Sequence, residues 1–186
     1  MTGLAGSGFG AGVVIAWSAI RLSEFLLSER NLGRLLAAGA LERCRSQHVP
    51  LLLANVAVAA LAVLGRALPG QVPAGVSVTA LVVLVAAETL HWWAILTLAP
   101  RWTTGVLVVP GEAPCRRGPY RWFRHPGYVG GSLSGAMLPL AAGSWPASLA
   151  AGALLATVVV FRVRCENEAW RSVGGHNATS PPSSAA

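Results

Sequence analysis

The chain has 186 residues, of which 54% are hydrophobic and only 11% are charged. Together with a mean hydropathy of +0.57, this scarcity of charge excludes an ordinary water-soluble globule, whose surface needs many more charged side chains. The net charge of +7 comes from arginines that flank apolar segments and do not form one basic face. We therefore expect a membrane protein that binds no nucleic acid.

Five apolar segments follow one another, at residues 9–28, 50–68, 75–99, 126–142 and 145–163. Crossing about 30 Å of hydrocarbon takes roughly 20 helical residues, so the first three segments are long enough to span a membrane. The last two are shorter and are bounded by glycine and proline, which predicts a helical hairpin with its turn between Leu138 and Pro146. The sequence thus predicts an all-α integral membrane bundle of about five transmembrane helices.

The placement of arginine predicts how this bundle is oriented. The connection between the first two spans and that between the third and fourth are rich in arginine, whereas the opposite connections hold only Arg66 or no charge. Because cytoplasmic loops carry the excess of basic residues, we expect the N-terminus outside and the C-terminus in the cytoplasm. The loop arginines that this orientation places in the cytoplasm are Arg30, Arg34, Arg43, Arg45, Arg101, Arg116, Arg117, Arg121 and Arg124.

Some features outside the spans give weaker predictions. Leucines alternate with arginines over residues 28–47, which predicts an amphipathic helix on the cytoplasmic face. The composition of residues 174–186 is typical of a disordered tail. Cys44, Cys115 and Cys165 are far apart, odd in number and in no metal-binding spacing, so we expect reduced thiols and no metal site.

Residues 116–131, RRGPYRWFRHPGYVGG, concentrate arginines, aromatics, prolines and glycines between two apolar segments. Glycine lets the backbone approach a ligand closely, proline fixes the course of the chain, and arginine binds anionic groups. Pro126 in the first turn of a helix leaves backbone N–H groups free for a carboxylate or phosphate, with His125 beside them. The pattern predicts either a ligand-binding loop or a simple topology signal.

The motif in this loop resembles that of one family. GPYRWFRHPGYVGG is similar to the GPY-R-x-x-RHPxYxG signature of the isoprenylcysteine carboxyl methyltransferases, which share their core with membrane phospholipid methyltransferases. RWTTGVLVVPGEAPCRRGPY and RLSEFLLSERN resemble a bacterial branch that O-methylates long-chain alkylpyrones and alkylresorcinols. The resemblance covers residues 20–171. It implies one methyltransferase domain over residues 1–173, with a cofactor loop at 101–131, in a bacterial inner membrane.

The resemblance also implies that the cofactor is S-adenosylmethionine and that no metal is required. The residues that map onto the family's cofactor-enclosing motif are Gly118, Tyr120, Arg121, His125, Pro126, Tyr128 and Gly130. The chemistry agrees, because helix-terminal N–H groups, a histidine donor and aromatic faces match the carboxylate, ammonium and adenine of this cofactor. Its methyl group is already activated, so transfer needs mainly alignment in a dry site.

The stretch FRVRCENEAW at the end of the last span supplies a second set of candidates. Arg162 and Glu166 are four residues apart, as are Arg164 and Glu168, so each pair shares a helix face as either an ion pair or part of a site. Family members have an arginine followed closely by two glutamates here. This likeness implies Arg164 and Glu166 as catalytic residues, with Arg162 in reserve. The chain departs from the pattern at Asn167, where a second glutamate is often found.

Two pairs of ionisable residues fall inside the predicted spans, where charge is costly unless it faces protein, water or a partner. Glu88 and His91 are three residues apart on one face, and we predict that they line the cavity for the acceptor. A protonated Glu88, or a Glu88–His91 pair, is the structural alternative. Arg21 and Glu24 have the same spacing, which predicts an ion pair.

The predicted function is methyl transfer from S-adenosylmethionine to a lipophilic acceptor that arrives from the bilayer. The branch resemblance favours the hydroxyl of an alkylresorcinol or alkylpyrone, or the carboxylate of a prenylated cysteine. Phospholipid amine methylation is an alternative. So is a non-catalytic membrane scaffold, which Asn167 favours. The expected partners are this acceptor and membrane lipids, with no obligate protein partner.

Overall fold

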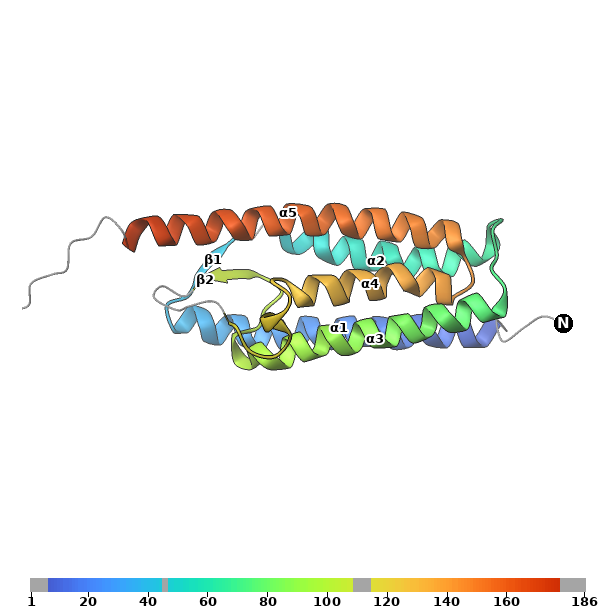
Figure 1. Ribbon diagram of the computed structural model, residues 1–186, viewed down its shortest axis with the longest axis horizontal. Helices are drawn as coiled ribbons and strands as arrows, with labels where there is room; N and C mark the ends of the chain where they lie inside the picture. Colours follow the sequence, from blue (N-terminus) through green and yellow to red (C-terminus); the bar gives the residue numbers. More distant parts are fainter. Residues whose placement is uncertain (1–6, 45–46, 109–114, 178–186) are drawn as a thin grey trace, which may run out of the picture.

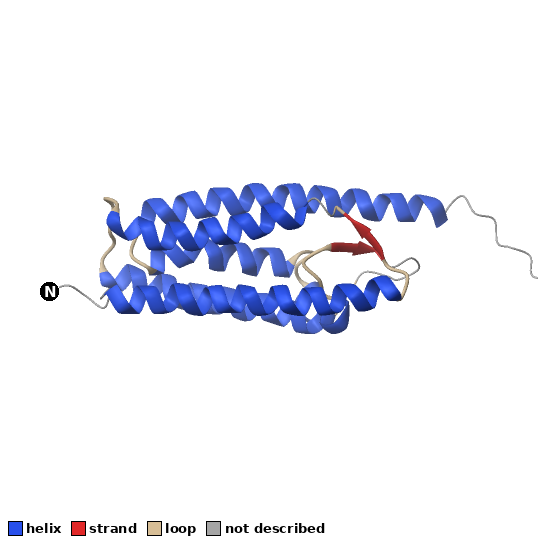
Figure 2. Ribbon diagram, turned by 180° about the vertical axis from the view of Figure 1, so that it is seen from behind, coloured by secondary structure: helices blue, strands red, loops and turns tan. Residues whose placement is uncertain are grey.

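The computed structural model describes residues 7–44, 47–108 and 115–177, and five long helices run along its long axis (Figure 1). These helices are α1 (Ser7–Ala37), α2 (His48–Leu64), α3 (Ala74–Leu98), α4 (Pro126–Ala141) and α5 (Trp145–Asn177). The short 3₁₀ helices are η2 (Gly65–Ala67), η3 (Ala99–Arg101) and η4 (Gly118–Arg121). Two strands, β1 (Leu41–Arg43) and β2 (Val106–Val108), form a small antiparallel sheet near one end of the bundle (Figure 2).

The predicted helical membrane bundle is confirmed. Four helices, α1, α2, α3 and α5, are long and apolar enough to cross a membrane. Large apolar side chains on all four are more than half exposed, for example Ile15, Leu53, Val82 and Leu149. Such an apolar surface suits hydrocarbon, which is as apolar as the side chains themselves.

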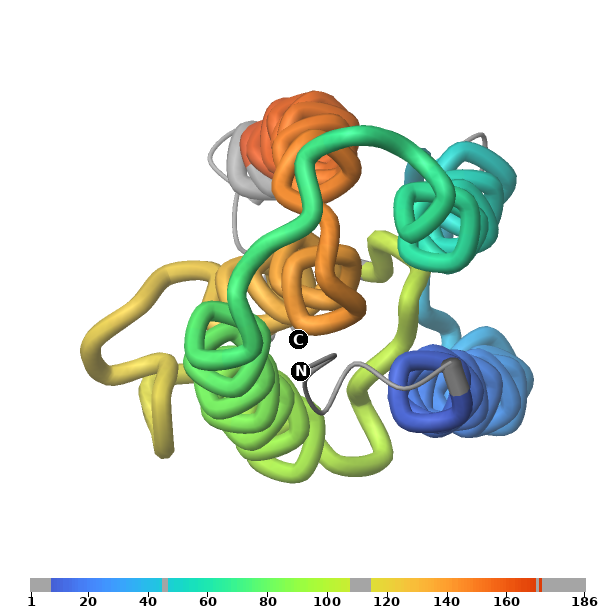
Figure 3. The backbone as a smooth tube through the Cα atoms, turned by 90° about the vertical axis from the view of Figure 1, so that its right-hand side faces the viewer, coloured from blue at the N-terminus to red at the C-terminus, as the bar shows by residue number. Residues whose placement is uncertain are grey.

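Helix α4 is shorter, with 16 residues, and is the most enclosed of the five. It lies among the other four helices when the bundle is viewed along its axis (Figure 3). The predicted hairpin with α5 is confirmed, and its turn contains Gly143 at a φ of +108°. The core that surrounds α4 includes Trp17, Val58, Leu138 and Leu155, with relative exposures of 5% or less.

At Gly130, α4 lies directly against the backbone of α3. A Cβ atom at this position would lie 2.7 Å from the carbonyl oxygen of Ala87 and 2.8 Å from the backbone nitrogen of His91. Backbone atoms cannot give way as a flexible side chain can, so only glycine fits. Gly130 is therefore needed first for helix packing, although the motif resemblance assigns it to the cofactor.

The predicted separate amphipathic helix over residues 28–47 is wrong. Helix α1 continues unbroken to Ala37, because its polar residues form hydrogen bonds with residues that follow α3 in the chain. Ser28 bonds with the side chain and backbone nitrogen of Thr104, and Asn31 donates to the carbonyl of Trp102. The chain then turns at Gly39, whose φ is +86°, and enters β1.

Helix α5 extends beyond the apolar segment predicted for it. It continues to Asn177, so it includes the first residues of the predicted tail at 174–186. Residues 178–186 lie outside the described part of the chain.

The expectation of reduced cysteines is wrong for two of the three. Cys44, directly after β1, and Cys165, on α5, form a disulfide across a sequence separation of 121 residues. Cys115 is free. Sequence distance was misleading because α5 returns to the end of the bundle at which β1 lies (Figure 1).

Replacing both Cys44 and Cys165 by serine is expected to lower the free energy of unfolding by about 2–4 kcal/mol, because the bond restricts the unfolded chain. Thermal unfolding in detergent measures this loss, and Cys115→Ser is the matched control. Digestion without reductant should also yield a linked peptide pair that contains Cys44 and Cys165. Two separate, alkylated peptides would contradict the assignment.

Replacing Gly130 by alanine is expected to destabilise the bundle by about 1–3 kcal/mol, because the new methyl group overlaps the backbone of α3. Gly152→Ala on α5 is the matched control, since its Cβ would lie at an ordinary 3.7 Å from Ala136. Both changes bring the same gain in helix propensity. Equal thermal unfolding midpoints for the two variants would show that α3 and α4 are not in such close contact.

Candidate functional site

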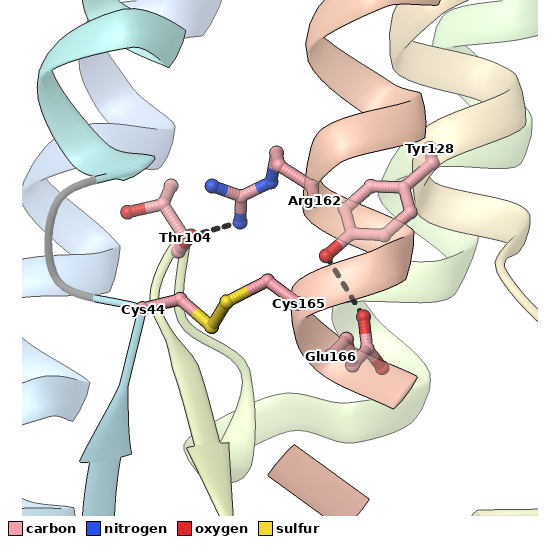
Figure 4. The surroundings of a disulfide bond; sticks show 6 residues. All are labelled: Cys44, Thr104, Tyr128, Arg162, Cys165 and Glu166. Carbon is pink, nitrogen blue, oxygen red and sulfur yellow. Dashed lines mark hydrogen bonds between the residues drawn. A yellow bond between two sulfur atoms is a disulfide. The ribbon is translucent and has the colours of Figure 1, made fainter. Parts of the chain in front are cut away.

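The candidate site lies at the end of the bundle where η4, the start of α4 and the last part of α5 meet. We call this the arginine-rich end, because Arg116, Arg117, Arg121 and Arg124 lie on the chain that leads into α4. The side chains that come together are Tyr128 from α4, Arg162 and Glu166 from α5, and His125 before α4 (Figure 4 shows all but His125).

Helix α4 begins where the motif predicts. His125 is the N-cap residue, with a φ of −132°, and Pro126 occupies the first helical position, where its missing N–H is no loss. The side chain of His125 makes no capping hydrogen bond to this helix end. Its first backbone N–H groups therefore have no partner within the helix and can bind an acceptor atom from elsewhere.

Tyr128, Glu166 and His125 form one polar cluster. The Tyr128 hydroxyl donates to Glu166 Oε2 at 3.0 Å, and His125 Nδ1 lies 3.7 Å from the same oxygen. The imidazole of His125 stacks on the ring of Tyr128, with centroids 5.4 Å apart and planes inclined by 14°. His125 Nε2 is buried and has no hydrogen-bond partner among the described residues.

Arg162 is the most unusual residue in the cluster. Its side chain is only 3% exposed, and its guanidinium lies 5.4 Å from the centre of the Tyr128 ring. Nη2 donates to the carbonyl of Thr104, as Figure 4 shows, whereas Nε and Nη1 have no partner within the described residues. A buried cation with free donors is costly, so this site is suited to an anionic group.

The structure distinguishes Arg162 from Arg164, the two candidate arginines on α5. Arg164 is exposed, whereas Arg162, the reserve candidate, faces Tyr128 and lies in the cluster with Glu166. In the described part of the chain, neither Arg162–Glu166 nor Arg164–Glu168 forms an ion pair. Helical spacing alone could not distinguish these faces.

Asn167 has a partner of its own. Its side-chain oxygen accepts a hydrogen bond of 2.8 Å from Arg124 Nη2, so it connects α5 to the chain before α4. Nothing in the sequence indicated that Thr104 would accept a hydrogen bond from Arg162, because any residue can supply a backbone carbonyl.

The remaining motif residues lie on the chain segment that leads into α4. Gly118 begins η4 at a φ of +53°, and a Cβ there would lie 2.5 Å from Thr97 Oγ1. Burial raises the pKa of the Tyr120 phenol well above its usual value, helped by nearby Cys115 and Glu166, so this hydroxyl stays protonated. Arg121 is exposed, with its guanidinium 5.5 Å from the ring centre of Trp122.

Glu88 and His91 lie elsewhere, in the interior between α1 and α3. Glu88 binds Arg21, and His91 Nε2 lies 3.2 Å from Glu24 Oε2. The predicted ion pair of Arg21 with Glu24 is confirmed at 3.0 Å. The Glu88–His91 pair considered from spacing does not form, because each residue pairs with α1 instead. That these residues line an acceptor cavity stays a prediction.

Comparison with known proteins extends these observations. The chain is 25% identical to the uncharacterized protein YpbQ of Bacillus subtilis (strain 168) over 150 residues, which is 80% of this chain and 89% of that protein. No solved structure matches the chain.

Residues 79–172 match the family described as isoprenylcysteine carboxyl methyltransferase (ICMT). The matched region is half of the chain and runs from α3 to α5, so it contains the whole polar cluster around Tyr128. The chain therefore belongs to the isoprenylcysteine carboxyl methyltransferase family and is a membrane methyltransferase.

Proposed function

We propose that the protein transfers a methyl group from S-adenosylmethionine to an oxygen atom of a lipophilic acceptor, at the arginine-rich end of the bundle. The observation that carries this proposal is Arg162, a buried cation beside Tyr128 and Glu166 whose Nε and Nη1 atoms have no hydrogen-bond partner in the described part of the chain. An acceptor oxygen that is anionic, or becomes so, would supply the missing negative charge.

The residues around α4 fit the cofactor. His125 Nε2 is a buried polar atom with no hydrogen-bond partner among the described residues, and the first turn of α4, which the His125 side chain does not cap, offers backbone N–H groups suited to a carboxylate. The stacked rings of His125 and Tyr128 present aromatic faces to a cation or a base. When bound, S-adenosylmethionine supplies a methyl group activated by its sulfonium. We assign cofactor binding to Gly118, Tyr120, Arg121, His125, Pro126 and Tyr128.

The chain's own residues would hold the acceptor and manage its proton. Arg162 orients an oxygen anion, and the Glu166 carboxylate accepts a proton when the acceptor is a hydroxyl. A phenol, with a pKa near 10, needs this help, whereas a carboxylate is already ionised at neutral pH. Tyr120 remains a neutral donor because its burial opposes ionisation.

The charge of the site favours some acceptors over others. The hydroxyl of an alkylresorcinol or alkylpyrone and the carboxylate of a prenylated cysteine both present a negative oxygen to Arg162. In a phospholipid amine the methyl-accepting atom is a nitrogen that is an ammonium at neutral pH, and the buried guanidinium would repel it. A scaffold without catalysis would need no affinity for S-adenosylmethionine, so cofactor binding by the purified protein distinguishes it.

Arg162→Gln is expected to reduce methyl transfer at least about 100-fold, because the buried positive charge that orients the acceptor is lost. Transfer of label from S-adenosylmethionine to a lipid extract measures this effect. Arg164→Gln tests the sequence-based alternative, and the exposed Arg171→Gln is the charge-matched control.

If methyl transfer were lost in Arg164→Gln alone, Arg164 and not Arg162 would be assigned as the catalytic arginine. Full activity in both Arg162→Gln and Glu166→Gln would reject this cluster as the site. Each variant is first checked for membrane insertion and for its thermal midpoint, so that misfolding is not read as lost chemistry.

The orientation can be tested with the free thiol of Cys115, since the other two cysteines are bonded. The arginines favour a cytoplasmic position for this end, whereas the Cys44–Cys165 disulfide is more typical of an oxidising compartment, so labelling decides between the two. If the arginine-rich end is cytoplasmic, a membrane-impermeant maleimide should label Cys115 only after the cells are opened. Leu68→Cys in a Cys115→Ser background is the control for the opposite end, because Leu68 is exposed between α2 and α3. Labelling of Cys115 in intact cells would reverse the proposed orientation.

A further inference from the structure

A second polar cluster lies in the interior of the bundle, away from Arg162. Arg21 and Glu24 of α1 meet Glu88 and His91 of α3, and Glu24, Glu88 and His91 are each less than 10% exposed. We call these four residues the interior network. Charge this deep in apolar surroundings is costly and is retained only when its groups are paired.

The contacts of the interior network form a continuous chain. Glu88 binds Arg21, Arg21 Nη1 lies 3.0 Å from Glu24 Oε2, and that oxygen lies 3.2 Å from His91 Nε2. The other ring nitrogen of His91, Nδ1, lies 2.7 Å from the carbonyl oxygen of Gly127, in the first turn of α4. The network therefore ends on the helix that carries Tyr128.

The partners of His91 determine where its protons lie. A carbonyl oxygen can only accept, so Nδ1 carries a proton and donates to Gly127. Nε2 lies 3.2 Å from Glu24 Oε2, but it makes no hydrogen bond within the described residues. The Gly127 carbonyl is therefore the hydrogen-bond partner of the His91 ring.

The start of α4 needs such an external anchor. Gly127, Gly130 and Gly131 lie in its first two turns, and glycine gives a helix little intrinsic order. The ring of His91 packs against this segment, and a Cβ at Gly131 would lie 3.2 Å from its Cε1 and Nδ1 atoms. His91 thus fixes the segment through both packing and a hydrogen bond.

We propose that His91 is a positioning residue, which holds the first turn of α4 through the Gly127 carbonyl and so places His125 and Tyr128 for cofactor binding. The effect on cofactor binding rests on the proposed function, whereas the contact between His91 and Gly127 does not. His91 acts through α4 and need not touch the cofactor or the acceptor.

Two substitutions separate the two contacts of His91. In His91→Asn, the amide nitrogen can lie close to the position of Nδ1, so the bond to Gly127 is retained. In His91→Gln, the longer side chain places its amide near the position of Nε2, so the contact with Glu24 is retained and the bond to Gly127 is lost. The pair is matched in polarity and differs in which partner it reaches.

Hydrogen exchange of the amides of residues 127–131, measured without cofactor, reports the order of the first turn. We expect faster exchange in His91→Gln than in the wild type, and near-wild-type exchange in His91→Asn. Calorimetry with S-adenosylhomocysteine should show affinity lowered about tenfold by His91→Gln and less than about threefold by His91→Asn, as expected for one lost hydrogen bond. At saturating cofactor, kcat should change less than KM.

Unchanged exchange in His91→Gln, or an equal loss in both variants accompanied by faster exchange throughout α3, would overturn the proposal. If His91→Gln fails to fold, ¹⁵N chemical shifts of the wild-type imidazole decide, and an unprotonated Nδ1 would overturn the proposal. If the wild type fails to bind S-adenosylhomocysteine, the proposed function is rejected, while hydrogen exchange still tests the anchoring of α4.

Discussion

Charge inside a helical membrane bundle must be paired, and this constraint governs where the polar side chains of this protein lie. In hydrocarbon there is no water to stabilise an unpaired ion, so Arg21 of α1 binds Glu24 on its own helix and Glu88 on α3. These pairs join α1 to α3, although most of the surface of α1 does not contact α3. The apolar residues of α1, such as Ile15, remain exposed.

The two polar clusters differ in how their cations are paired. In the interior network, Arg21 is paired with both Glu24 and Glu88, although Arg21 Nε, Glu24 Oε1 and His91 Nε2 have no hydrogen-bond partner within the described residues. At the arginine-rich end, Arg162 is buried and is paired with no carboxylate within the described residues, and its Nε and Nη1 atoms have no hydrogen-bond partner there. A buried cation without a carboxylate is suited to an anionic ligand.

Helix α4 connects the two clusters. Its glycines let it approach α3 closely enough for His91 to reach the Gly127 carbonyl, and one residue later Tyr128 faces Glu166 and Arg162 on α5. At the same end, the Cys44–Cys165 disulfide holds the chain after β1 against α5 beside Glu166 (Figure 4). The candidate site is thus supported on one side by buried polar contacts and on the other by a covalent bond.

Local patterns in the sequence determined the helical membrane class, the α4–α5 hairpin, the start of α4 at Pro126 and the Arg21–Glu24 pair, because each depends on neighbours within a few residues. Tertiary structure alone decided the rest. Helical spacing brings both Arg162 and Arg164 to the membrane boundary, but only packing against α4 buries one and exposes the other. The Cys44–Cys165 bond and the carbonyl of Thr104 are also contacts between distant segments, which leave no periodic trace in a sequence.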